Sequence, residues 1–169
     1  MAIEGPNAKL ESLLGLLEEL PREKKVIIWA RYVSELRMIA QALGRANCVM
    51  YWGEVAAKDR NDNIDRFMTE SACRYFVGNT KVGKYGFTLT AAEHVVYFSN
   101  DFSAEARWQS EDRVHRIGQT KSVTITDLMA VDTIDQPVLD SLNEKRQLAE
   151  FFKNPDPVNF RDRLLEMLT

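Results

Sequence analysis

The 169-residue chain predicts an α/β fold in three layers, with helices flanking a mostly parallel central sheet. Residues 26–30 form a continuous apolar run of strand length, Val-Ile-Ile-Trp-Ala, which is typical of a strand buried on both faces. Segments with strand and helix patterns alternate along the rest of the chain. This alternation favours βαβ units, whose crossovers are right-handed and whose strands run parallel.

Local patterns predict the individual elements. Asn7 is placed to cap a first helix whose leucines recur at helical spacing, and Pro21 ends it. Gly44 is the expected C-cap of a second helix. This second helix is expected at 34–43, and further helices at 57–69, 134–152 and 158–168. One more helix is expected after the strand at 94–98, with the arginines near its end. Further strands are expected at 48–51, 75–77 and 123–129. The expected parts are an N-terminal amphipathic helix at 1–24, an α/β lobe at 25–152, and a linker with a C-terminal helix at 153–169.

The composition is that of a globular protein, with 45% hydrophobic residues and a net charge of −3. This charge excludes a wholly basic surface, so any nucleic-acid contact has to be a local patch or be shared with a partner. Cys48 and Cys73 make no disulfide framework, which favours a reducing compartment. Without a signal-peptide pattern or a membrane-spanning run, we expect an intracellular protein of the cytoplasm or nucleus with no membrane partner. The only histidines are His94 and His115, and no Cys/His spacing indicates a metal site.

The segment 109–119, Gln-Ser-Glu-Asp-Arg-Val-His-Arg-Ile-Gly-Gln, carries the strongest functional signal. On a helix, four of its residues would share one face at positions i, i+3, i+4 and i+7, namely Gln109, Asp112, Arg113 and Arg116. Two arginines on one face form a charged fork suited to the oxygens of a transferring phosphoryl group. A plainer interpretation is a solvated face on which Asp112 pairs with Arg116.

The literal string resembles the last helicase motif of the Swi/Snf-type ATPases, a branch of the superfamily-two helicases. That motif reads Gln-x-x-Asp-Arg-x-His-Arg-Ile-Gly-Gln, and residues 109–119 match every fixed position. The resemblance implies that Arg113 and Arg116 are catalytic arginine fingers, which reach across a cleft between two lobes to ATP. It also implies that Gln109 and Asp112 lie at that nucleotide cleft.

Residues 78–85 nearly spell a phosphate-binding P-loop, which would suit a self-contained phosphotransferase. That pattern requires Ser or Thr after the Gly-Lys pair, because the hydroxyl holds magnesium, and Tyr85 stands there instead. A P-loop also opens directly into a helix, and Gly86 interrupts the chain at that point. A working P-loop is therefore the weakest of the alternatives.

Residues 80–90 instead resemble the preceding Swi/Snf motif, typically Thr-Lys-Ala-Gly-Gly-x-Gly-Leu-Asn-Leu-Thr. Lys84 replaces a glycine of that pattern, and Thr88 replaces its asparagine. In the family, this motif couples the nucleotide cleft to the nucleic-acid track. The resemblance implies that Gly83 and Gly86 lie at the cleft. The residues expected to bind nucleic acid are Thr80, Lys81 and Thr90, with Arg31 in the segment 25–32 that resembles the family's first strand of this lobe.

The resemblance covers about residues 25–152 and implies a RecA-like fold, the second lobe of a helicase motor. ATP with Mg²⁺ would then be bound mainly by a first RecA-like lobe, which this chain lacks and which the same parent polypeptide or a partner subunit would supply. The expected track is double-stranded DNA, as in DNA translocation or chromatin remodelling. The alternative is a freestanding, non-catalytic interaction or regulatory module derived from such a lobe.

Overall fold

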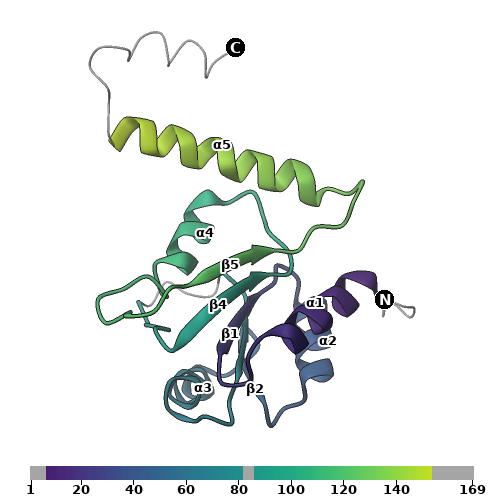
Figure 1. The fold of residues 1–169 in the computed structure, drawn as a ribbon, viewed down its shortest axis with the longest axis vertical. Helices are drawn as coiled ribbons and strands as arrows, with labels where there is room; N and C mark the ends of the chain where they lie inside the picture. Colours follow the sequence, from purple (N-terminus) through teal and green to yellow (C-terminus); the bar gives the residue numbers. More distant parts are fainter. Residues whose placement is uncertain (1–6, 82–85, 154–169) are drawn as a thin grey trace.

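The computed structural model describes residues 7–81 and 86–153, which form a parallel sheet flanked by helices (Figure 1). Its strands are β1 (Lys25–Trp29), β2 (Cys48–Tyr51), β3 (Tyr75–Gly78), β4 (Ala92–Tyr97) and β5 (Thr124–Asp127). Its helices are α1 (Ala8–Glu19), α2 (Val33–Leu43), α3 (Ala57–Thr69), α4 (Ala104–Glu111) and α5 (Asp135–Lys153). In the described ranges the strand order is β2-β3-β1-β4-β5, and every neighbouring pair is parallel. The predicted α/β fold with a parallel sheet is confirmed.

Strand β1 lies in the middle of the sheet, between β3 and β4. Its four apolar residues, Val26, Ile27, Ile28 and Trp29, are all fully buried. Because successive side chains point to opposite faces, Val26 and Ile28 pack on one side and Ile27 and Trp29 on the other. The continuous apolar run therefore reflects a strand that is covered on both faces.

The two faces of the sheet have separate hydrophobic cores. Helices α1 and α2 cover one face, and their buried residues include Leu13, Leu36 and Ile39. Helix α3 covers the other face through Phe67, which is fully buried. Figure 1 shows α3 on the opposite side of the sheet from α1 and α2. Each of these buried side chains contributes about 1.5–3 kcal/mol of transfer free energy, and together they fix the three-layer arrangement.

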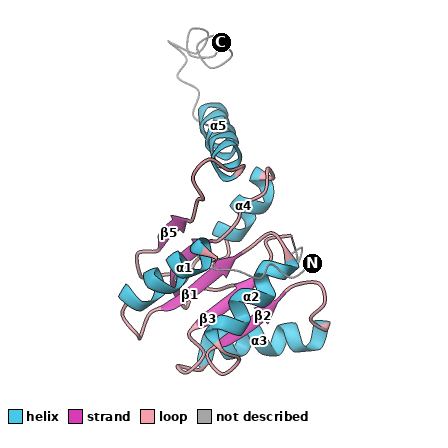
Figure 2. Cartoon of the chain, turned by 90° about the vertical axis from the view of Figure 1, so that its right-hand side faces the viewer, coloured by secondary structure: helices cyan, strands magenta, loops and turns pink. Residues whose placement is uncertain are grey.

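Helix α5 lies beyond the sheet and packs against α4, as both ribbon views show (Figure 2). The contact is a small apolar cluster of Ala104 and Trp108 from α4 with Val138 and Leu142 from α5. The expected linker and helix after residue 153 fall outside the described residues, so the division of the chain into three parts stays a prediction. Among the helices that the structure describes, none has the length and apolar character needed to cross a membrane.

Local signals placed several of these elements correctly. The Asn7 side chain caps α1 by accepting a hydrogen bond of 3.0 Å from the backbone N–H of Leu10. Gly44 ends α2 with a φ of +76°, in the region that favours glycine. At the carboxyl end of β3, a Cβ on Gly78 would lie only 2.8 Å from the Trp29 ring. Glycine at this position therefore lets the rings of the sheet core pack closely beside the strand end.

Candidate functional site

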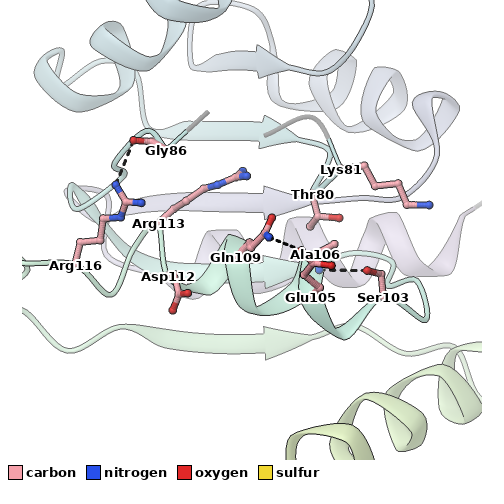
Figure 3. Close-up of a pocket in the computed structure, with 10 residues that line it drawn as sticks. All are labelled: Thr80, Lys81, Gly86, Ser103, Glu105, Ala106, Gln109, Asp112, Arg113 and Arg116. Atoms are coloured by element: carbon pink, nitrogen blue, oxygen red, sulfur yellow. Dashed lines mark hydrogen bonds between the residues drawn. The ribbon is translucent and has the colours of Figure 1, made fainter. Parts of the chain in front are cut away.

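A cleft of about 800 Å³ lies at the carboxyl end of β3, beside α4 and the turn that follows it. Residues from these segments form its walls (Figure 3): Thr80, Lys81, Gly86, Ser103, Glu105, Ala106, Gln109, Asp112, Arg113 and Arg116. Most of the residues predicted from the sequence as site residues are among them. Ligands of open α/β sheets bind outside the carboxyl ends of the strands, which is where this cleft lies.

The arginines do not lie on a helix, so the expectation of one helical face over residues 109–116 is wrong. Helix α4 ends at Glu111, and Asp112 is its C-cap. The chain then turns, and the backbone N–H groups of Val114 and His115 both donate to the Glu111 carbonyl at 3.0 Å. Val114 in this turn is fully buried in the sheet core. Gln109 still faces the same cleft as the arginines because the turn folds back beside α4 (Figure 3).

Arg116 is exposed and reaches from the turn to the segment that follows β3. Its Nη1 donates to the Gly86 carbonyl at 3.2 Å and lies 3.3 Å from the Thr88 hydroxyl oxygen, which accepts a second bond. Among the ion pairs of the described residues, none joins Asp112 to Arg116, so the plainer ion-pair interpretation is not realised. Arg116 instead links the two segments that resemble neighbouring helicase motifs.

Arg113 extends from the same turn in a different direction, into the wall of the cleft (Figure 3). Only 3% of its surface is exposed. The centre of its guanidinium lies 4.4 Å from the centroid of the Phe87 ring and 5.6 Å from that of Trp29. Burial lowers the pKa of Arg113 below its ordinary value. The backbone carbonyl of Arg113 accepts a hydrogen bond of 2.8 Å from the N–H of Leu89, which joins the turn to the segment that also contacts Arg116.

Two further polar side chains of the cleft, Lys81 after β3 and Gln109 on α4, already have partners. Lys81 forms an ion pair of 2.5 Å with Asp101, although 59% of the lysine side chain is exposed. Burial alone would raise the pKa of Asp101, but hydrogen bonds from Lys81 and the Ser103 backbone hold it below its ordinary value. On α4, the Gln109 amide donates to Glu105 at 2.9 Å. The cationic side chains that line the cleft are those of Lys81, Arg113 and Arg116.

Arg31 and Thr90, also predicted from the sequence, do not line this cleft. Arg31 follows β1 and is half-buried, and its guanidinium lies 5.1 Å from the Tyr32 ring. Its backbone N–H donates to the Ser99 hydroxyl, and its carbonyl accepts from the Asn79 amide. The Thr90 carbonyl accepts from Gln119 at 3.2 Å. Gly83 lies outside the described residues.

Asn79 and Ser99 were not predicted as site residues, although Asn79 directly follows β3 and Ser99 lies two residues after β4. The Asn79 side chain joins the ends of two strands, since it donates to the Arg31 carbonyl and accepts from the Lys81 N–H. Ser99 donates to Glu35 on α2 at 2.5 Å. These side chains fix the strand ends beside the cleft.

A buried ion-pair network behind the arginine turn was also missed by the sequence interpretation. Arg107 on α4 is 8% exposed and donates to Asp127 through two nitrogens, at 2.6 and 3.0 Å. It also donates to Glu111 at 2.6 Å, and Glu111 accepts a further bond from Arg146 of α5. The network therefore anchors the residue whose carbonyl holds the start of the arginine turn.

The cleft walls offer nitrogen donors of the kind that phosphate oxygens accept. Arginine and lysine bind phosphate through charge-assisted hydrogen bonds. Within residues 7–81 and 86–153, no group of three or more His, Cys, Asp or Glu side chains is gathered closely enough to hold a metal ion.

The model of the helicase conserved C-terminal domain family matches residues 8–118 of this chain. The chain belongs to this family. Human lymphoid-specific helicase is 32% identical to it over 136 residues, which cover 79% of this chain and 16% of the human protein. The Drosophila melanogaster SWI/SNF-related matrix-associated actin-dependent regulator of chromatin subfamily A-like protein 1 is 32% identical over 143 residues, or 83% of this chain and 19% of that protein. The solved C-terminal part of the Fun30 ATPase domain matches with a TM-score of 0.71 at 29% identity, over 79% of this chain and 44% of that one.

These relatives confirm the resemblance to Swi/Snf-type helicases, and the Fun30 structure confirms the RecA-like fold. The helicase C-terminal domain of this chain spans less than a fifth of the length of either relative named above. The family match ends at Gly118, so it includes both arginines of the turn and the segment around Gly86.

Proposed function

We propose that this helicase C-terminal domain is the second lobe of an ATP-dependent DNA helicase or translocase, and that it completes an ATP site held mainly by a first lobe. The observation that carries the proposal is convergence on a single cleft. Gln109, Arg113 and Arg116 reach the cleft from α4 and its turn, and Gly86 reaches it from the segment after β3. Two segments that are far apart in the sequence thus meet at one cleft, and the turn after α4 supplies two arginines to it.

Arg116 is the better placed of the two proposed arginine fingers. It is exposed, and both of its hydrogen bonds to the segment after β3 use one nitrogen of a guanidinium that carries five N–H donors. The remaining donors suit the oxygens of a transferring phosphoryl group, where developing charge needs a fixed cation. An arginine that is already anchored to Gly86 and Thr88 would lose little conformational entropy on meeting the phosphate.

ATP is the proposed substrate, and its Mg²⁺ would neutralise part of the phosphate charge. The carboxylates that line this cleft are poor ligands for Mg²⁺. Glu105 already accepts a hydrogen bond from Gln109, and Asp112 is the only other carboxylate in the lining. We therefore assign the metal, with most of the nucleotide, to the first lobe. That lobe would come from the same parent polypeptide or a partner subunit.

The proposed nucleic-acid contacts lie at the carboxyl ends of the central strands. Lys81 follows β3 with 59% of its side chain exposed beside its ion pair with Asp101, and Arg31 follows β1, which is the neighbouring strand. Asn79 joins these two strand ends, so a phosphate backbone could contact both. Thr80 and Thr90 would add hydroxyl contacts, and none of the four side chains would read the base sequence. Double-stranded DNA is the proposed track, in the nucleus or the cytoplasm.

The test compares this chain alone with the same chain joined to its first lobe. We expect negligible ATP hydrolysis by the isolated chain and nucleic-acid-stimulated hydrolysis by the two-lobe protein. Turnover by the isolated chain at the two-lobe rate would contradict the half-site proposal.

The burial of Arg113 favours a second candidate, a freestanding regulatory module derived from a helicase lobe. An arginine with 3% of its surface exposed offers little to a phosphate unless the wall of the cleft rearranges. If the two-lobe protein bound nucleic acid but hydrolysed no ATP in its presence, the module would become the better proposal.

A further inference from the structure

Arg113 sits between two aromatic rings, those of Phe87 and Trp29, which we call the aromatic cage. The centre of the guanidinium lies 4.4 Å from the Phe87 centroid and 5.6 Å from the Trp29 centroid, within the range of cation–π attraction. Both rings of the cage pack on other core residues. The centroid of the Phe87 ring lies 4.7 Å from that of Tyr51, and Trp29 is fully buried in the sheet core. Phe87 is the closer of the two rings and the only one that is partly exposed.

Phe87 stands where the Swi/Snf pattern described above has leucine, after the second glycine of the Gly-x-Gly run. A leucine of similar size would fill the space but would present no π face to the guanidinium. The attraction between Phe87 and Arg113 is therefore a property of this chain's own sequence rather than of the motif.

We propose that Phe87 is a positioning residue whose ring holds the Arg113 guanidinium in the wall of the cleft, so that Arg113 meets a phosphate only after its guanidinium leaves the Phe87 ring. This inference rests on the proposed function for the role of Arg113. The backbone offers no simple release, because the Leu89 N–H is bonded to the Arg113 carbonyl at 2.8 Å and Leu89 is fully buried. The side chain of Phe87 is partly exposed at the edge of the sheet core, so we assign the release to movement of the Arg113 and Phe87 side chains.

The test measures how fast each arginine of the isolated chain reacts with phenylglyoxal, with the modified residues identified by mass spectrometry. In the wild-type chain, exposed Arg22 should react fast, whereas Arg113 and Arg107, which are 3% and 8% exposed, should react slowly. Phe87→Leu should raise the Arg113 rate by about tenfold, the change expected when a partly desolvated cation–π contact is lost. Phe87→Tyr keeps a π face and should leave Arg113 slow.

Arg107 reports whether the fold is intact, because its protection comes from a separate ion-pair network. A rate at Arg113 that stays slow in Phe87→Leu would overturn the proposal. So would a rise that Arg107 shares, since that indicates general loosening, or an equal rise in Phe87→Tyr, since that removes the role of the π face. The labelling needs no ATP hydrolysis, so its outcome is independent of whether the proposed function holds.

Discussion

Replacing Arg107 tests the importance of the buried network that supports the arginine turn. Arg107 is 8% exposed and holds two carboxylates, Asp127 and Glu111, whose side chains are 18% and 13% exposed. Its guanidinium also lies 3.4 Å from the Tyr97 ring centroid. Burial alone would lower the pKa of Arg107, but the hydrogen bonds that it donates to Asp127 and Glu111 raise it above its ordinary value. The Arg107→Ala variant would leave Asp127 with the neutral Asn100 amide in place of a cation. Glu111 would keep its bond from Arg146.

The expected cost follows from what remains buried. Removing one partner of a buried ion pair costs about 3–5 kcal/mol, because the other charge stays in the interior. Asp127 and Glu111 are not fully covered, so water can reach them in the variant and we expect the lower end, about 3 kcal/mol. For a domain of this length, that free energy corresponds to a fall in Tm of about 6–12 °C.

Urea unfolding followed by circular dichroism measures this change. The matched control is Arg66→Ala, because Arg66 pairs with Glu70 on the surface of α3, with side chains 39% and 51% exposed. A surface pair of this kind contributes about 0.5 kcal/mol or less. If Arg107→Ala were as stable as the control variant, the network would be energetically irrelevant and the reasoning refuted.

Two further predictions concern the sheet. Gly78→Ala should destabilise the fold by about 1–3 kcal/mol, because its Cβ would lie 2.8 Å from the Trp29 ring. Gly15→Ala is the control and should not destabilise the fold, because nothing lies within 4 Å of the added Cβ. Thermal unfolding compares the two variants, and equal Tm values would contradict the close packing at Gly78. Burial lowers the pKa of His94 in the folded protein below its ordinary value of about 6.5. Between these two pKa values the unfolded chain binds more protons than the folded protein, so the free energy of unfolding should fall as the pH drops. Urea unfolding from pH 5 to 8 should lose this slope in His94→Gln but keep it in His115→Gln, and an unchanged slope in His94→Gln would refute the assignment.

The sequence predicted those parts of the fold that depend on local patterns. The apolar run at 26–30 predicted the central strand β1. Asn7 predicted the start of α1, and Gly44 predicted the end of α2, because each of these signals acts within a few residues. It also identified the segments around Gly86 and Arg116, which the structure brings to one cleft. The role of each residue in that cleft stays a prediction.

The sequence failed where tertiary contacts decide the local structure. Helical spacing predicted one helix over 109–116, yet α4 ends at Glu111 and the next turn buries Val114 in the sheet core. Thr88 departs from the motif as the sequence shows, but the sequence did not predict that its hydroxyl accepts a hydrogen bond from Arg116. The burial of Arg113 between two rings depends on Trp29, a residue 84 positions away in the sequence, and no local pattern reports such a contact.

The most direct test of the central claim is the rate of nucleic-acid-stimulated ATP hydrolysis by the two-lobe protein carrying Arg116→Ala. An arginine finger predicts a loss of about 10³-fold or more. Arg37→Ala is the control, because Arg37 is an exposed arginine that pairs with Glu54 at another site, and it should leave the rate unchanged. A rate near that of the wild-type protein in Arg116→Ala would contradict the claim that this lobe completes the ATP site.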